Sequence, residues 1–291
     1  MKKINIFCFG FGQVAQNFLN KIKLENIEVE LNVTSRSKSQ KKNIGKLSYE
    51  CFQFNDNLFD KDLISKLKNS DHILISIPPI NGEDVVIKNF LKFISESKSK
   101  WITYLSATSV YGDHQGKWVD ENSNTFPTST HGVNRLKAEK SWMELAVSKK
   151  IPLQIFRLSG IYSNKKNVLT RLKSGNAKIV NMKDHYFSRI HVEDIANVLF
   201  KSLTNFKSQE IYNISDDKPA STKEITQYGM KLLGIKENSS IDVKEIQSEM
   251  LKSFYNESKK VSNKKMKKIF NYELKFPTYI EGLSYIRDNS I

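Results

Sequence analysis

The stretch that decides the fold is Lys2 to Leu19, KKINIFCFGFGQVAQNFL, close to the start of the 291-residue chain. Its apolar run stops at Gly10, a second glycine follows at Gly12, and a helix-like pattern of apolar residues then begins. We therefore predict a strand, a tight turn and a helix. The two glycines let the backbone turn sharply and approach a pyrophosphate, and Ala15 is small enough for the helix to lie against the strand.

The first turn of this helix is the predicted phosphate site. Backbone N–H groups and the helix dipole both favour an anion at a helix N-terminus. We therefore assign Gln13 and Val14, which follow Gly12, to cofactor binding together with Gly10 and Gly12. The alternative is a plain βα turn, which the spacing G-x-G-x-x-A alone does not exclude.

Composition excludes several classes of protein. With 39% hydrophobic residues the chain can bury a sizeable core, as one large domain or two interlocked ones. No apolar run approaches the roughly 20 residues of a membrane span, and the start lacks the apolar core of a signal peptide. We expect a cytoplasmic protein that does not enter membranes. Cys8 and Cys51 are interpreted as free buried thiols, with no metal-binding spacing and no disulfide framework.

The chain is strongly basic, with a formal net charge of +15. A basic field attracts phosphate groups. The lysines are nevertheless scattered, and the densest run, NKKMKK at Asn263 to Lys268, is interpreted as the solvated face of a late helix. No nucleic-acid motif is recognised. We therefore expect an anionic small molecule as the partner, and not a nucleic acid.

A second predicted strand, Ile27 to Val33, bears on the choice of cofactor. In dinucleotide-binding folds an acidic residue at this strand end binds the ribose 2′-hydroxyl, whereas an arginine accommodates a 2′-phosphate. Here the acid is missing, and Ser35 and Arg36 follow the strand. The pattern favours NADP over NAD, with Ser35 and Arg36 as contacts. A solvent-facing loop arginine is the alternative.

Strand-like and helix-like segments alternate through the first half of the chain. Further strands are predicted at 49–54, 71–77, 101–105 and 152–158, with helices at 58–67, 84–94 and 132–148. This alternation is typical of an α/β protein, a Rossmann-type doubly wound parallel sheet. Beyond Gly160 the rhythm changes, with a helix at 168–172, the segment 187–200, a strand at 210–214 and a helix at 222–233.

This change of rhythm predicts a smaller, interleaved C-terminal lobe, which we assign to the substrate. We assign residues 1–158 and about 189–214 to an NADP-binding Rossmann domain, and about 159–188 and 215–291 to the small lobe.

Two strand ends carry residues suited to a cofactor. The fourth strand ends in Ser76-Ile77-Pro78-Pro79, where two prolines fix a rigid loop at its carboxyl end. Open α/β sheets bind ligands on this side. The fifth strand opens into Ser106. We assign Ser76, Pro78 and Ser106 to cofactor binding.

Several motifs occur together in a specific order: SATSVYGD at Ser106 to Asp113, PTSTHGVNRLKAE at Pro127 to Glu139, RLSGIY at Arg157 to Tyr162, RIHVEDIA at Arg189 to Ala196 and YNISDD at Tyr212 to Asp217. With the glycine turn they resemble the extended, here atypical, short-chain dehydrogenase/reductase superfamily, in its NAD-dependent epimerase/dehydratase group. The resemblance implies a nucleotide-sugar-like substrate. It also implies a homodimer formed through the helices at 84–94 and 132–148.

The catalytic positions depart from this pattern. Where the group has a Ser or Thr, this chain has Ala107, and its Tyr-x-x-x-Lys is replaced by His131 and Arg135. Arginine can still hold ribose hydroxyls, so Arg135 is assigned to both the cofactor and the catalytic set. Thr108, Tyr111 and His131 are the candidates for moving a proton, because an imidazole titrates near neutral pH and Thr108 lies beside Ala107. The alternatives are a helix-entry histidine without chemistry at His131 and a structural role for Tyr111.

The resemblance further implies substrate contacts at Arg157, Arg189 and His191. Two functions stay open from the sequence. One is an NAD(P)-dependent, epimerase/dehydratase-like oxidoreductase that acts on an anionic, sugar-nucleotide-like molecule. The other is a non-catalytic NADP-binding sensor of the same fold, which the loss of the usual hydroxyl and tyrosine favours.

Overall fold

The computed structural model describes residues 3–177, 179–182, 184–236, 240–242, 245–246 and 255–290. The chain forms two compact units. Unit 1 comprises Met1–Ala107, Asn134–Arg157 and Ile195–Tyr212, and unit 2 comprises Thr108–Val133, Leu158–Asp194 and Asn213–Ile291. The domain boundaries expected from the sequence stay a prediction, and their last residue, 291, lies outside the described residues.

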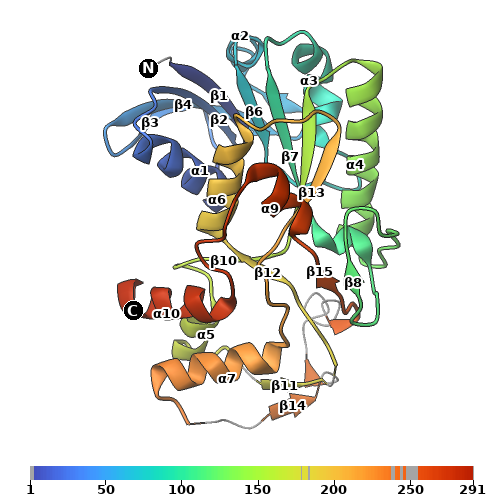
Figure 1. Cartoon of the computed structure of the whole chain (residues 1–291). Helices are drawn as coiled ribbons and strands as arrows, with labels where there is room; N and C mark the ends of the chain where they lie inside the picture. Colours follow the sequence, from blue (N-terminus) through green and yellow to red (C-terminus); the bar gives the residue numbers. More distant parts are fainter. Residues whose placement is uncertain are drawn as a thin grey trace. The chain divides into compact units, whose positions relative to one another are not determined.

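A central sheet organises unit 1 (Figure 1). Its strands are β1 (Ile4–Phe9), β2 (Val29–Ser35), β3 (Gln40–Ile44), β4 (Leu47–Asn55), β6 (His72–Ile75), β7 (Trp101–Ala107), β9 (Leu153–Leu158) and β13 (Glu210–Ile214). They follow the order β13-β9-β7-β6-β1-β2-β4-β3, and β1 runs parallel to both β2 and β6. The pairs β2 with β4 and β6 with β7 are parallel too. The predicted mostly parallel α/β sheet is confirmed.

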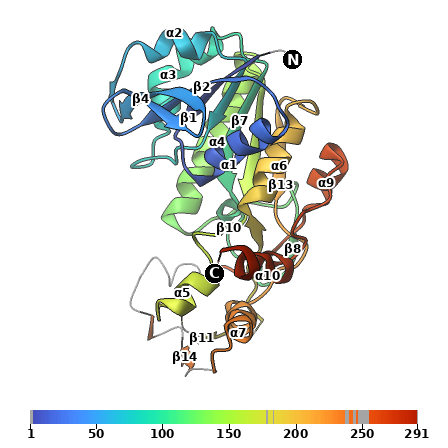
Figure 2. The same cartoon turned by 90° about the vertical axis from the view of Figure 1, so that its left-hand side faces the viewer.

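Helices cover both faces of this sheet (Figure 2). They are α1 (Gln13–Leu24), α2 (Leu63–Lys68), α3 (Val85–Ser95), α4 (Thr130–Ser148) and α6 (Val192–Ser202). The helices α2, α3 and α4 share one apolar core with β1, β6 and β7, built around fully buried side chains such as Phe9, Phe90 and Trp142. On the other face Phe18 of α1 stacks on Trp101, whose indole N–H donates to Ser202 of α6. Apolar burial on both faces explains why these strands read as continuous apolar runs.

Part of the predicted helix at 58–67 is wrong. Leu58 and Phe59 form a short strand, β5 (Leu58–Phe59), which pairs antiparallel with the end of β4, and the helix α2 begins only at Leu63. The chain reverses at Asp56, whose φ is +54°. Phe59 packs against Phe90 at 4.8 Å between ring centroids, so burial of this aromatic ring overrides the local helical pattern.

The strand β3 was not predicted from the sequence. This strand, QKKNI, pairs antiparallel with β4 at the edge of the sheet, in a segment to which no element was assigned from the sequence. Edge strands tolerate lysines because one side of the strand meets water, and lysines also discourage pairing with other chains. The sequence of β3 therefore lacks the alternation of apolar and polar residues that would have predicted a strand.

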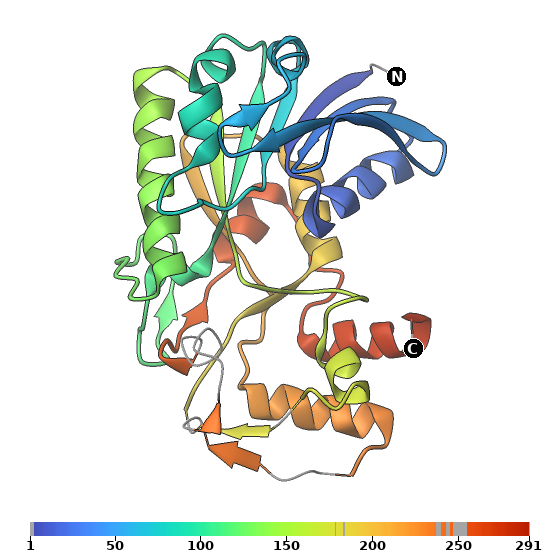
Figure 3. The ribbon, with the colours of Figure 1, turned by 180° about the vertical axis from the view of Figure 1, so that it is seen from behind.

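Unit 2 is built from shorter elements, seen from behind in Figure 3. They are η1 (Thr108–Tyr111), β8 (Trp118–Val119), β10 (Gly160–Tyr162), α5 (Val168–Lys173), β11 (Ile179–Asn181), β12 (Arg189–His191), α7 (Thr222–Leu233), β14 (Ser240–Asp242), β15 (Lys260–Val261), α9 (Lys264–Phe270) and α10 (Tyr279–Ser290). An apolar core joins α5, α7 and α10 around Leu169, Ile225 and Ile286. Three parallel strand pairs, β10 with β12, β11 with β14 and β8 with β15, complete the unit.

Two smaller predictions can be compared directly. Cys8 and Cys51 are free and buried, as expected. The lysine-rich run lies on α9, whose Met266 and Phe270 are fully buried. Among the described residues, no helix combines the length and the apolar character needed to cross a membrane.

Candidate functional site

The glycine turn after β1 is shaped by close contacts. Gly10 has φ +84°, a conformation that residues with a Cβ rarely adopt, and a Cβ there would lie 2.8 Å from Ser76 Oγ. Its backbone N–H donates to Thr34 Oγ1 at 2.9 Å, and Ser76 Oγ donates to the Phe9 carbonyl at 2.9 Å. The ends of β1, β2 and β6 are thus held together. Ser76, predicted as a cofactor contact, fixes the turn itself.

Gly12 has the opposite surroundings. It is the N-cap of α1, it is exposed, and a Cβ added there would meet nothing within 4 Å. Gly12, the N-cap residue, has no side chain with which to cap the helix, and the first turn of the helix carries no acidic residue. Open space in front of an uncapped helix N-terminus fits a pyrophosphate. Gln13 is half-buried and Val14 is buried, so backbone groups and not the valine side chain would face such a ligand.

The end of β2 carries the two residues predicted to select NADP. Ser35 is half-buried, and its Oγ accepts a hydrogen bond from Cys51 Sγ at 3.2 Å. Arg36 is exposed and makes no hydrogen bond or ion pair within the described part of the chain. Its guanidinium is therefore free for a ligand. Sequence reasoning missed Thr34, because nothing in the sequence marks a strand hydroxyl that holds a turn 24 residues away.

Two further predicted contacts follow β6 and end β7. Pro78 is exposed. Ser106 is 3% exposed, and its Oγ has no hydrogen-bond partner among the described residues. A buried hydroxyl without a partner is uncommon, and a bound group is one of its physical explanations.

Arg135 is held at the end of β7 from its place on α4. Its Nη1 donates to the Leu105 carbonyl at 2.6 Å and to the Tyr104 hydroxyl at 3.2 Å, and the guanidinium lies over the Tyr104 ring. The side chain is half-buried. The predicted cofactor residues, Arg135 included, all belong to unit 1. Those on β1, β2, β6 and β7 or just after them gather at the carboxyl ends of these strands, and they fit a dinucleotide.

The candidate proton-transfer residues lie in unit 2. A Cβ at Gly132 would be 2.7 Å from the Ser109 carbonyl oxygen, so the first turn of α4 packs directly on η1. This contact brings the segments that carry Thr108 and His131 together. Thr108 is 9% exposed, whereas His131 is exposed and its ring has no partner among the described residues.

Tyr111, the third candidate, is fully buried in unit 2. Its hydroxyl donates to Asn213 Oδ1 at 2.8 Å. A phenol in this position is engaged in holding η1 to the end of β13, and this placement favours a structural role over proton transfer.

Arg157, predicted as a substrate contact, is 4% exposed and forms a buried ion pair. Its Nε and Nη2 both donate to the Glu139 carboxylate, the shortest bond being 2.7 Å from Nη2 to Oε2. Glu139 lies on α4, so the pair links this helix to β9. A guanidinium used in this way supports the fold of unit 1.

Arg189 begins β12 and is half-buried in unit 2. Its Nη1 donates to the Phe187 and Ala220 carbonyls at 3.0 and 2.9 Å, and no described residue accepts from Nε or Nη2. Burial lowers the pKa of Arg189, while the nearby Asp216 carboxylate acts in the opposite direction. Asp216 is itself 1% exposed, and burial raises its pKa well above the ordinary value. Arg189 therefore keeps donors for a ligand beside a buried carboxyl.

His191, the third predicted substrate contact, is fully buried. Its ring packs between Tyr162 and Phe276, at centroid distances of 5.1 and 4.2 Å, and Nδ1 accepts from the Glu193 N–H. Burial lowers the pKa of His191 to about 4. A neutral imidazole in an aromatic stack favours a packing role.

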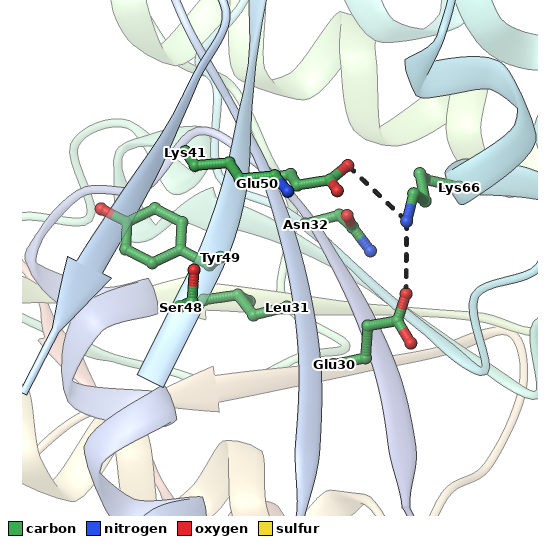
Figure 4. A pocket seen from close by; sticks show the side chains of 8 residues that line it. All are labelled: Glu30, Leu31, Asn32, Lys41, Ser48, Tyr49, Glu50 and Lys66. Carbon is green, nitrogen blue, oxygen red and sulfur yellow. Dashed lines mark hydrogen bonds and ion pairs between the residues drawn. The ribbon is translucent and has the colours of Figure 1, made fainter. Parts of the chain in front are cut away.

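A hollow of about 200 Å³ lies on the sheet beside α2 (Figure 4). Lys66 Nζ lies between two of its carboxylates, 3.5 Å from Glu30 and 3.6 Å from Glu50. Glu30 and Asn32 are in the first half of β2, away from its carboxyl end. These half-exposed ion pairs are typical of a solvated surface, and the hollow is separate from the candidate cofactor site.

Comparison with known proteins supports the motifs. A family model described as the NAD dependent epimerase/dehydratase family matches residues 85–215. A curated protein of Bacillus subtilis, the uncharacterized UDP-glucose epimerase YtcB, is 31% identical over 121 residues, which are 37% of this chain and 38% of that protein. The chain thus spans little more than a third of the relative it matches.

Solved structures match over nearly the whole chain. A conserved protein of unknown function from Silicibacter pomeroyi is 30% identical, with a TM-score of 0.86, and the match covers 98% of this chain and 99% of that one. UDP-N-acetylglucosamine 4-epimerase from Bacillus cereus is 18% identical over 98% of both chains, with a TM-score of 0.73. UDP-glucuronic acid 4-epimerase from Bacillus cereus, solved in complex with NAD, is 16% identical over 98% of both chains, with a TM-score of 0.77. The last two likenesses concern the fold.

Proposed function

We propose that this chain, which belongs to the NAD dependent epimerase/dehydratase family, is an oxidoreductase that binds NADP(H) at the glycine turn and acts on an anionic, sugar-nucleotide-like molecule. The glycine turn carries this proposal. Gly10 is required by its positive φ and its contact with Ser76, whereas Gly12 leaves open space before an uncapped helix N-terminus. A plain βα turn does not require the open space at Gly12 in front of the helix.

The preference for NADP is supported by the end of β2. Arg36 is exposed. The two residues at this strand end, Ser35 and Arg36, offer a hydroxyl and a guanidinium and no carboxylate. An unpaired guanidinium suits a phosphate monoester, because it supplies several donors in a planar array. An aspartate or glutamate, which would suit the free 2′-hydroxyl of NAD, is absent from Thr34 to Ser39.

The positions of the side chains support the following chemical roles. Bound NADP(H) would supply the hydride. We assign the nicotinamide ribose to Arg135, whose guanidinium is fixed by the Leu105 carbonyl and keeps further N–H donors. Because the Tyr111 hydroxyl is already donated to Asn213, we place the proton transfer to a substrate oxygen on His131 or Thr108. Arg189, with unused donors in unit 2, is the proposed contact for the anionic group of the substrate.

Unfolding temperatures in the presence of each cofactor test the binding half of the proposal. A ligand that binds the folded state at 100 times its Kd adds about 2.7 kcal/mol to apparent stability. NADPH should raise the melting temperature more than NADH does, and Arg36→Ala should remove this difference. Lys140→Ala, which removes an exposed charge on α4, should leave it unchanged. An equal response of the parent to both cofactors would remove Arg36 from its assigned role.

Turnover separates the two candidate functions. The NADPH-loaded and NADP-loaded protein should change nicotinamide absorbance with at least one member of a panel of nucleotide sugars, and His131→Ala should slow this change at least about tenfold, within the usual range for a general acid or base. Val133→Ala, an exposed change on the same helix turn, is the matched control. Binding without turnover would favour the second candidate, an NADP sensor, which Ala107 and the engaged Tyr111 hydroxyl support.

A further inference from the structure

The turn that carries Thr108 is unusually constrained. It consists of η1 and Gly112, whose φ is +73° and at which a Cβ would overlap the Phe126 carbonyl. The Gly112 N–H donates to the Ser109 carbonyl at 3.3 Å. Its carbonyl accepts from Lys259 Nζ at 2.8 Å. A distant lysine thus holds the end of the turn.

Lys259 is buried together with its counter-ion. It is 8% exposed, and its Nζ lies 2.8 Å from Glu257 Oε2. The other oxygen, Glu257 Oε1, is buried without a hydrogen-bond partner among the described residues. Burying two charges costs more in desolvation than surface pairing does, and apolar replacements are often as stable. Stability alone is therefore a poor reason for an ammonium at this place.

The segment around this lysine, Glu257–Ser262, runs along the loop that follows the turn, and we call it the strap. Its only regular pairing within the described residues is short, with Lys260 opposite Trp118 and Val261 opposite Val119 in β15 and β8. Two paired positions specify register weakly, and a slip by one residue would turn every strap side chain to the other face.

Polar contacts of the strap help to fix its register, among them the bond from the Val261 N–H to Ser188 Oγ at 2.9 Å and the contacts of Ser258 and Lys259. The Ser258 N–H donates to Asp113 Oδ1 at 2.8 Å, and its carbonyl accepts from the N–H groups of His114 and Gly116 at 3.1 and 2.9 Å. The bond from Lys259 to Gly112 continues this row toward the turn.

The other side of the turn is attached to the same strap. Tyr111 donates to Asn213 Oδ1, and Asn213 Nδ2 donates to the Ser262 carbonyl at 3.2 Å. The strap is therefore linked to two adjacent residues of the turn. Lys259 bonds directly to Gly112, and Ser262 is linked to Tyr111 through Asn213.

We propose that Lys259 is a positioning residue, which fixes the turn Thr108–Gly112 through the Gly112 carbonyl and so sets the place of Thr108, one of the two residues to which the proton transfer is assigned. The catalytic part of this inference rests on the proposed function. The structural part does not, because the order of the turn can be measured in the absence of any substrate.

Amide hydrogen exchange of the full chain tests the structural part. Lys259→Met alone would leave Glu257 as a buried unpaired charge, so the decisive variant is the double change Glu257→Gln, Lys259→Met. Exchange in the peptide covering residues 108–116 should rise at least about tenfold, while the peptide covering β1 and α1 keeps the parent rate. Lys260→Met, which removes the ammonium above the Tyr186 ring, is the matched control and should change neither peptide.

Cofactor binding and turnover then distinguish positioning from general support. The double variant should retain NADPH-induced stabilisation and the parent KM for NADPH, while kcat falls about tenfold or more. Lys259→Arg, which keeps a cation, should restore part of kcat. An unchanged exchange rate at 108–116 in the double variant would overturn the inference. A parent without turnover would count against the proposed enzyme alone, because the exchange result still decides the role of Lys259.

Discussion

At the scale of single residues, the two glycines of the first turn have different surroundings, and these suggest different reasons for a glycine at each position. Gly10 is needed by the fold, since its φ of +84° and its contact with Ser76 leave no place for a side chain. Gly12 is not needed by the fold, since the space in front of it is open. We therefore expect a substitution at Gly10 to lower stability and a substitution at Gly12 to affect ligand binding.

Substitutions at these two positions should separate the effects. Gly10→Ala should lower the free energy of unfolding by about 1–3 kcal/mol, because a non-glycine residue is strained at this φ. Gly12→Val should change the free energy of unfolding by less than about 1 kcal/mol and abolish NADPH binding, because the side chain would fill the phosphate space. Urea unfolding and NADPH titration of both variants check this. Loss of binding without loss of stability in Gly10→Ala would reverse the assignment.

The buried pair of Arg157 and Glu139 should behave as a structural ion pair. Arg157→Met leaves a buried unpaired carboxylate and should cost about 3–5 kcal/mol in the free energy of unfolding. The double change Arg157→Met, Glu139→Leu should recover most of this loss, because both charges are then gone. Urea unfolding midpoints of the single and double variants give the comparison. A single variant as stable as the parent would show that the pair has no structural role.

His191 should make stability depend on pH on the acid side. Its folded pKa, about 4, lies below the unfolded value of 6.5, so the unfolded chain binds the proton first as the pH falls and stability is lost between about pH 6.5 and 4. From pH 7 to pH 5 this loss is about 2 kcal/mol. His191→Asn, which keeps an acceptor for the Glu193 N–H, should lose that much less over the same interval. The half-buried His72, whose pKa burial also lowers to about 4, contributes alike in both proteins. If the parent and His191→Asn lost the same free energy of unfolding between pH 7 and pH 5, the lowered pKa of His191 would be contradicted.

At the scale of elements, Asp84 joins α3 to α4. Its Oδ1 accepts from the Val86 and Ile87 N–H groups at the start of α3, and its Oδ2 accepts from the Trp142 indole on α4 at 2.9 Å. Asp84→Ala removes the cap and leaves a buried indole N–H unpaired, so it should cost about 2–4 kcal/mol. Asp84→Asn, which keeps the capping oxygen, should cost less. Urea unfolding should rank parent, Asn and Ala in this order.

The elements that the sequence predicted well are those with one dominant local signal. The strand at Ile4–Phe9 was predicted because an apolar run stops at a glycine. The helix at Thr222–Leu233 is also present as predicted, and in the structure Ser221 and Glu224 form a capping box at its start. The strands β3 and β5 were missed because their evidence is a partner strand, β4, and not a pattern of their own. Long-range pairing of this kind is invisible in a local window.

At the scale of the whole molecule, the candidate site residues divide between the two units. The predicted cofactor residues lie in unit 1, whereas Thr108, His131 and Arg189 lie in unit 2. The sequence motifs that carry them cross this division, between Ala107 and Thr108 and again between Val133 and Asn134. Sequence alone named these residues, but it could not tell that Arg157 and His191 are buried in pairs and stacks, because their partners lie far along the chain.

Binding of a dinucleotide at the glycine turn is the central claim, and calorimetric titration of NADPH into the parent and into Gly12→Val tests it most directly. We predict saturable binding of one NADPH per chain by the parent and none by Gly12→Val, with both proteins equally folded by circular dichroism. A parent that binds neither NADPH nor NADH, or a Gly12→Val variant that binds as tightly as the parent, would contradict the account.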